Sequence, residues 1–228
     1  MQPPTGEPPE NIKSRLKESY DAVAEVYNTW TVPHSASRLK YLGQLLQLLP
    51  RSQDAQISVL ELGCGAGVPV TEKLLADPRI SVTANDLSST QISMAKSALG
   101  TERVDWIEGD MMALEFPNES FDAVLGFYSV IHLPRDEQLV LVQRITAWLK
   151  PGGLMLVNFA SEDKETVVME KWLDDKGWMF WSGWGADAMI KKVGEAGLDI
   201  VHGEIAQDVG DAEFLWVIAR KPGAEHNK

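Results

Sequence analysis

The chain contains a single cysteine, few basic side chains and no long apolar run. Because a disulfide needs two cysteines, Cys64 excludes an internal disulfide and any metal site built from cysteines, and it indicates a reducing, cytoplasmic compartment. The 21 basic side chains stand against 33 acidic ones, a formal net charge of -12, so a nucleic-acid partner, which needs a cationic surface, is not expected. No run reaches the roughly 20 apolar residues that span a bilayer, and residues 1–10 lack the basic and apolar regions of a signal peptide. We therefore expect neither a nucleic-acid nor a membrane partner.

What the sequence does contain is ordinary globular composition. In 228 residues, 44% are hydrophobic and 24% are charged, which predicts one folded unit with appendages. Residues 1–10 hold four prolines and are expected to be a disordered leader. Residues 11–50 carry two helical patterns, interrupted at Pro33 and closed by Pro50, and are expected to form cap helices. The main domain is then residues 51–222, with an aromatic insertion at residues 161–185.

Beyond residue 50, short β-branched runs alternate with helical stretches, a pattern typical of βαβ units and a parallel sheet. It predicts an α/β fold of three αβα layers, Rossmann-like, around a seven-stranded, mostly parallel sheet. Only a Gly/Asp turn at residues 208–211 separates the last two strands, so these should form an antiparallel C-terminal hairpin. The expected strands are residues 57–62, 80–85, 104–108, 121–127, 154–159, 199–204 and 214–219, and the expected helices are residues 67–76, 89–99, 136–149 and 185–196.

The strongest local signal is VLELGCGAG at residues 59–67, an apolar strand that runs into three glycines just before a helix. Gly63, Gly65 and Gly67 allow a sharp turn and a close approach of the backbone to a ligand, which predicts a nucleotide-type site. A tight turn without a ligand is the alternative. Glu61 would place a carboxylate beside a pyrophosphate, which is electrostatically unfavourable, whereas a cationic or zwitterionic ligand would be favoured by it.

A dinucleotide site is disfavoured by a second feature of this loop. The fingerprint G-x-G-x-x-G needs a small residue at its last position, but Val68 or Val70 stands there, depending on the glycine from which the motif is counted. A nicotinamide-dependent oxidoreductase is therefore the weaker interpretation.

The pattern E-x-G-x-G-x-G resembles motif I of the class I S-adenosylmethionine-dependent methyltransferases, in particular their small-molecule, type 11-like group. Asp86, about 20 residues beyond the loop, occupies the position where that family binds the ribose hydroxyls, although it could instead cap the following helix. Asp110 and Met111 match the positions that contact the adenine. Segments at residues 121–134 and 149–157 are also similar, so the resemblance covers about residues 57–220 and implies S-adenosyl-L-methionine as cofactor, with S-adenosyl-L-homocysteine as product. The cofactor contacts implied are Tyr20, Glu61, Gly63, Cys64, Gly65, Gly67, Asp86, Leu87, Gln91, Asp110, Met111 and Phe127.

His132 is the candidate catalytic base, because it lies just past the fourth strand, where the family's acceptor site opens, and an unperturbed imidazole titrates near neutrality. A structural histidine packed beside the cofactor is the favoured alternative. Tyr20 and Tyr27 are seven residues apart and share one face of the first helix, which either contacts the cofactor and acceptor or packs on the core.

The stretch KWLDDKGWMFWSGWG at residues 171–185 is unusually rich in large rings. Such rings can line an apolar acceptor pocket, or they can form a lid on the sheet edge or a dimer contact. No metal site is implied, because the acids there are adjacent rather than facing. The expected acceptor contacts are Tyr27, Tyr128, Trp178, Phe180 and Trp181.

Together these features predict a methyltransferase that moves the methyl group in line to O, N or S of a small apolar or aromatic molecule, as a monomer or homodimer. The alternative is a methyltransferase-like protein that binds the cofactor without transferring methyl, in a regulatory role or as an isomerase or cyclase.

Overall fold

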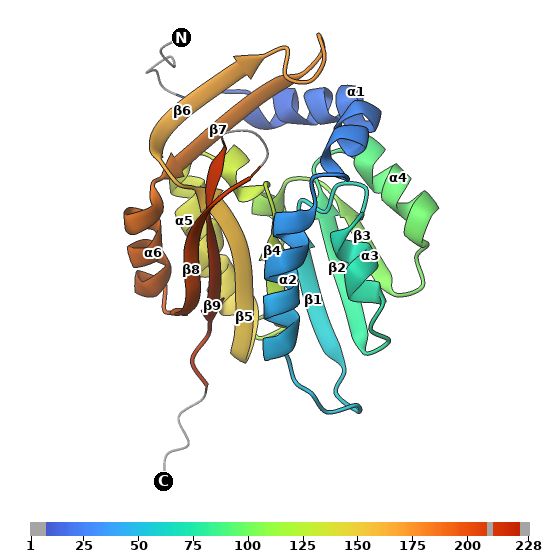
Figure 1. The fold of residues 1–228 in the computed structure, drawn as a ribbon, viewed down its shortest axis with the longest axis vertical. Coiled ribbons are helices and arrows are strands. Elements are labelled where there is room, and N and C mark those ends of the chain that lie inside the picture. Colours follow the sequence, from blue (N-terminus) through green and yellow to red (C-terminus); the bar gives the residue numbers. More distant parts are fainter. Residues whose placement is uncertain (1–7, 209–211, 224–228) are drawn as a thin grey trace.

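The computed structural model describes residues 8–208 and 212–223, and shows a seven-stranded sheet with helices on both faces (Figure 1). The strand order is β3-β2-β1-β4-β5-β9-β8, with β1 to β5 parallel and β9 antiparallel to both β5 and β8. This confirms the predicted fold class and the antiparallel C-terminal hairpin. The strands are β1 (Ile57–Leu62), β2 (Ile80–Asp86), β3 (Val104–Glu108), β4 (Phe121–Gly126), β5 (Leu149–Ala160), β8 (Asp199–Gln207) and β9 (Glu213–Arg220).

The central strands are mostly apolar because both faces of the sheet are covered. One face packs against α2, α3 and α4, and the other against α5 and α6. Leu60 of β1 belongs to the core under α5, whereas its neighbour Val59 belongs to the core under α2, as the alternation of side chains along a strand requires. The helices are α1 (Ile12–Thr31), α2 (Ala36–Leu48), α3 (Val70–Leu75), α4 (Ser89–Leu99), α5 (Arg135–Trp148) and α6 (Ala186–Glu195), with short 3-10 turns η1 (Met111–Ala113) and η2 (Val130–His132).

The sequence-based prediction missed one element, a separate antiparallel hairpin within residues 161–185. It consists of β6 (Asp163–Glu170) and β7 (Trp178–Trp184), and it lies with α1 across the end of the sheet at which the glycine loop emerges (Figure 1). Trp178 and Phe180 of β7 are buried against Ile12 and Leu16 of α1. This contact between segments about 165 residues apart in sequence covers the glycine loop that follows β1.

Several element boundaries also differ from the expected ones. Strand β5 begins at Leu149, directly after α5, rather than at residue 154, and the helix expected at residues 67–76 begins only at Val70. Of the expected leader, residues 1–7 lie outside the described residues, as do residues 209–211 of the expected turn. The division into leader, cap and main domain stays a prediction.

Candidate functional site

The glycine loop between β1 and α3 is held by the carboxylate of Asp86 at the end of β2. Oδ2 of Asp86 accepts a hydrogen bond of 2.8 Å from the backbone N–H of Gly65, and Oδ1 accepts one of 2.8 Å from the N–H of Ser88. The cap of α4 is Ser88, whose Oγ accepts from the N–H of Gln91 at 3.1 Å. Burial raises the pKa of Asp86 to about 6, although both hydrogen bonds oppose this shift. Each carboxylate oxygen has a second lone pair, so Asp86 can accept two further hydrogen bonds.

The three loop glycines have different structural reasons for lacking a side chain, although all have positive φ. A Cβ on Gly63 would lie 2.3 Å from Cβ of Ser129, and one on Gly67 would lie 2.7 Å from Cδ1 of Leu99, so these two permit close packing of the protein on itself. A Cβ on Gly65 would meet only Oε1 of Gln91, at 3.9 Å. Gly65 therefore leaves open space beside the loop.

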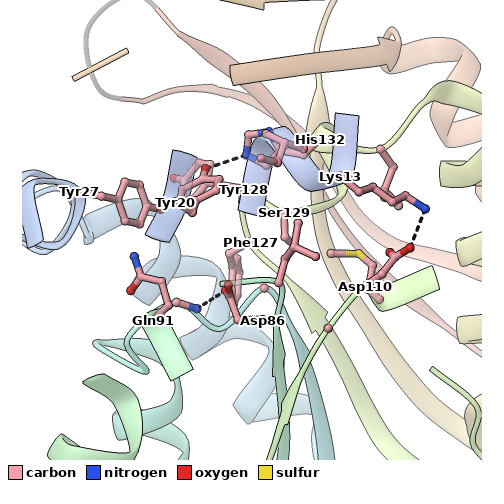
Figure 2. Close-up of a pocket in the computed structure, with 17 residues that line it drawn as sticks. Lys13, Tyr20, Tyr27, Asp86, Gln91, Asp110, Phe127, Tyr128, Ser129 and His132 are labelled. Atoms are coloured by element: carbon pink, nitrogen blue, oxygen red, sulfur yellow. Dashed lines mark hydrogen bonds and ion pairs between the residues drawn. The ribbon is translucent and has the colours of Figure 1, made fainter. Parts of the chain in front are cut away.

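That space is a cavity, here called the loop cavity, of about 690 Å³ including its part open to solvent. Figure 2 shows Asp86 and Gln91 on one side, Asp110 and Lys13 on another, and Tyr20 with His132 across the top. Oε1 of Gln91 accepts from Nδ2 of Asn28 at 3.0 Å, whereas its Nε2 is buried without a hydrogen-bond partner among the described residues. The expected contacts that line the loop cavity are Tyr20, Gly63, Gly65, Asp86, Leu87, Gln91, Asp110, Met111 and Phe127, together with the expected acceptor contacts Tyr27 and Tyr128 and with His132.

Three of the expected cofactor contacts, Glu61, Cys64 and Gly67, are not part of this lining. Glu61 is buried and accepts a 2.6 Å hydrogen bond from Oγ1 of Thr71, so it fixes the loop to α3 from behind. Burial raises the pKa of Glu61 to about 8, so this carboxyl is mostly protonated at neutral pH and supplies little charge to a ligand. Cys64 is buried in the core beneath α2 and α3, and Gly67 packs on α4.

Lys13 of α1 closes the side of the loop cavity formed by Asp110. Its Nζ lies 2.7 Å from Oδ2 of Asp110 and 2.7 Å from Oε2 of Glu137, while Oδ1 of Asp110 accepts from the N–H of Met112 at 2.9 Å. These ion pairs raise the pKa of Lys13 against the opposing effect of its burial. Sequence reasoning missed Lys13, because nothing in an amphipathic helix pattern indicates which strand end its polar face will contact. The other lining residues missed are Leu16, Gly109, Ser129 and Leu133.

His132 lies at the top of the loop cavity in a chain of two hydrogen bonds. Its Nδ1 is 2.7 Å from the carbonyl oxygen of Phe180 and its Nε2 is 2.9 Å from the hydroxyl of Tyr20. A carbonyl can only accept, so Nδ1 carries the proton and Nε2 accepts from Tyr20. Burial lowers the pKa of His132 to about 4 and raises that of Tyr20 well above its usual value. At neutral pH the imidazole is uncharged, and its basic nitrogen already has a partner.

A second cavity, here called the aromatic cavity, opens on the far side of Tyr20 and His132 and has about 1510 Å³ including its part open to solvent. Tyr27 and Tyr128 also line both cavities, so the two spaces meet at these four side chains. Tyr128 has φ of 52°, a sparsely populated conformation for a residue with a side chain, which is typical of functional sites.

The hairpin β6–β7 contributes to the aromatic cavity differently from the prediction. Trp181 lines it, but Trp178 and Phe180 do not, because they are buried under α1. Trp172, in the turn between β6 and β7, lines the cavity although it was not among the expected contacts, and so does Trp30 of α1. The rings in this stretch had predicted a pocket in general but not which of them face it.

Within residues 8–208 and 212–223, no group of three or more His, Cys, Asp or Glu side chains could hold a metal ion. No helix in the same residues is long and apolar enough to cross a membrane.

Comparison with known proteins finds a family model, curated relatives and solved structures that resemble this chain. Residues 59–153, from within β1 to within β5, match a family model described as a methyltransferase domain. The sterol 24-C-methyltransferase ERG6B of Gibberella zeae is 26% identical over 91% of this chain and 60% of its own length. The chain spans about 55% to 60% of the length of the first curated relatives that it matches.

Solved structures share the fold at low sequence identity. The cyclase SpnF superposes with a TM-score of 0.72 at 18% identity, covering 96% of this chain and 100% of its own. The 1,6-didemethyltoxoflavin-N1-methyltransferase of Burkholderia thailandensis, solved with 1,6-didemethyltoxoflavin and S-adenosylhomocysteine bound, has a TM-score of 0.68 at 19% identity, covering 97% of this chain and 93% of its own.

Proposed function

We propose that this chain acts as the class I S-adenosylmethionine-dependent methyltransferases that it resembles do: it binds S-adenosyl-L-methionine in the loop cavity and transfers the methyl group to a small molecule in the aromatic cavity. The observation that carries this proposal is the junction of the two cavities at Tyr20, Tyr27, Tyr128 and His132. Two ligands that fill the two spaces would meet there, which is the arrangement that a direct transfer between them requires.

The loop cavity fits the cofactor chemically. Asp86 has lone pairs left to accept from both ribose hydroxyls, and Nε2 of Gln91 is a buried donor that a ligand oxygen would satisfy. Asp110 and Met111 would hold the adenine, the carboxylate by accepting from the amino group and the thioether by packing on the ring. Gly65 leaves room for the methionine end beside the loop backbone.

When bound, the cofactor supplies a methyl group already activated by its sulfonium. The chain therefore has to orient an acceptor and exclude water, and orientation alone can lower a barrier by about 7 to 11 kcal/mol in ideal intramolecular cases. Helix α1 and the hairpin β6–β7 provide the exclusion, because they cover the end of the sheet above the loop (Figure 1).

We assign His132 a positioning role rather than that of a base. Its Nε2 is occupied by the Tyr20 hydroxyl, and its lowered pKa makes it a poor proton acceptor. Its imidazole instead fixes the Tyr20 hydroxyl at the junction of the cavities, while the Phe180 carbonyl fixes the tautomer.

The proposal is tested by incubating the protein with methyl-deuterated S-adenosylmethionine and a small-molecule extract of its source, while cofactor binding is followed by calorimetry. A labelled product supports transfer, and its fragmentation identifies the attacked atom. Binding without any labelled product supports the second candidate, a cofactor-binding protein of another activity, which the similarity to the fold of a cyclase keeps open. Absence of binding would refute both.

A further inference from the structure

The walls of the aromatic cavity are built from seven aromatic rings. The Trp172 ring is central, because its centroid lies 5.8 to 6.2 Å from those of Tyr20, Tyr27, Trp30 and Trp181. The remaining two, Tyr128 and Phe214, contact each other at 5.2 Å. The face of an aromatic ring carries partial negative charge, so several rings around one space attract a cation as well as apolar groups.

The charged side chains that line the same cavity are mostly acidic. They are Glu162, Asp208 and Glu213, against a single cation, Lys164, whose Nζ is 2.5 Å from Oε2 of Glu162. The charges of Lys164 and Glu162 cancel each other, so the net charge of the lining comes from the carboxylates of Asp208 and Glu213. Two histidines also line the cavity: His34, whose Nδ1 lies 2.6 Å from the carbonyl oxygen of Trp30, and His132, which its lowered pKa keeps neutral.

One further cation lies nearby but is not part of the lining. The guanidinium of Arg38 is 5.7 Å from the Tyr128 ring, and it donates to the carbonyl oxygen of Thr31 and to Oγ of Ser35 at 2.6 and 2.9 Å. It is buried behind Tyr128 and is absent from the cavity lining. The surface that a ligand would meet is therefore aromatic and net negative.

These features discriminate between acceptors. A carboxylate or phosphate acceptor would be repelled by Asp208 and Glu213 and would find no unpaired cation among the lining residues that the structure describes. A phenol or alcohol benefits from a base, but Nε2 of His132 is already hydrogen-bonded to Tyr20. An amine needs no base in the transfer step, because its own lone pair attacks.

We propose that the acceptor is an aliphatic amine, and that the aromatic cavity recognises the alkylammonium ion formed from it. This rests on the proposed function. The amine first releases the proton of its ammonium form to solvent. In the transfer, the nitrogen lone pair freed in this way forms the N–CH3 bond while the S–CH3 bond breaks and its electron pair returns to sulfur. The positive charge thus moves from sulfur to nitrogen, into the space between the rings and the two carboxylates. A tertiary amine keeps this charge, whereas a primary or secondary one then releases a proton to solvent.

The test uses the complex with S-adenosylhomocysteine and two probes of equal shape. Choline carries a quaternary ammonium group, and 3,3-dimethyl-1-butanol has a carbon in place of that nitrogen. Titration calorimetry, supported by quenching of tryptophan fluorescence, should give at least tenfold tighter binding of choline. The preference should fall severalfold in Trp172→Leu and in Asp208→Asn, a substitution that keeps the size of the side chain.

Two control variants are matched to these. Trp184→Leu removes a ring that packs on Lys192 outside the cavity, and Glu102→Gln removes an exposed carboxylate outside the cavity lining. Both should leave the preference unchanged. Equal affinity for the two probes, no binding of choline, or an equal loss in the controls would each overturn the amine assignment. Because binding of S-adenosylhomocysteine is measured first, failure of the proposed function appears separately, as absence of that binding.

Discussion

Asp86 should make cofactor binding depend on pH in a way that one substitution removes. Burial raises its pKa to about 6, so it is about 90% ionised at pH 7 and about 10% ionised at pH 5. Hydrogen bonds donated by two ribose hydroxyls favour the ionised carboxylate. If only that form binds well, the affinity for S-adenosylhomocysteine should fall about tenfold, or about 1.4 kcal/mol, between pH 7 and pH 5.

The assay is calorimetric titration of S-adenosylhomocysteine at pH 5, 6, 7 and 8 at constant ionic strength. Asp86→Asn keeps a carbonyl oxygen for the Gly65 amide but cannot ionise, so its affinity should be lower by about 1.5 to 3 kcal/mol at pH 7 and nearly independent of pH. Asp105→Asn, at an exposed position of β3, changes the net charge equally and should behave as the unaltered protein does. A pH dependence that persists in Asp86→Asn would refute the reasoning, because the titrating group would then lie elsewhere.

The remaining predictions concern buried groups near the site. The raised pKa of Glu61 means that the free energy of unfolding should decrease as pH rises from about 4.5 to about 8 and level off above, because only the unfolded state releases this proton in that interval. Urea unfolding across this range should show a smaller decrease in Glu61→Gln, which preserves the contact with Thr71. Trp178→Ala should lower the free energy of unfolding by about 3 to 5 kcal/mol, since it empties a core site under α1, and full stability in denaturant titration would contradict that position. His132→Gln should lower turnover by the same factor from pH 6 to pH 9 if it positions Tyr20, whereas a loss that varies with pH would identify a base.

The sheet could be predicted from sequence because its signals are local. Strand Ile57–Leu62 and helix Ser89–Leu99 have the bounds expected from their apolar runs and, for the helix, from its Ser88 cap. The hairpin β6–β7 could not, because β6 reads DKETVVME and has little apolar periodicity of its own. Its stability comes from packing of β7 on α1, a contact between distant segments that no local pattern encodes.

Because local sequence patterns do not encode contacts between distant segments, only some of the site residues could be predicted from the sequence. Loop glycines and Asp86 are positioned by the strand ends that carry them, so their placement at the cavity follows from the fold. Phe180 and Trp181 are successive residues of one strand and must face opposite sides, yet an aromatic run does not indicate which side is the cavity. Lys13 reaches the site only because α1 folds back over the sheet.

The division between these two kinds of residue coincides with a division of roles. Residues on the sheet's loop ends form most of the loop cavity, to which α1 adds Lys13 and Leu16, whereas α1 and the hairpin supply Tyr20, Trp30, Trp172 and Trp181 to the aromatic cavity. Tyr20 belongs to both, and its hydroxyl is fixed by His132, whose own ring is fixed by the Phe180 carbonyl of the hairpin. A shift of the hairpin would therefore move the junction itself. Acceptor selectivity should accordingly respond to substitutions in residues 171–177 while cofactor affinity stays constant.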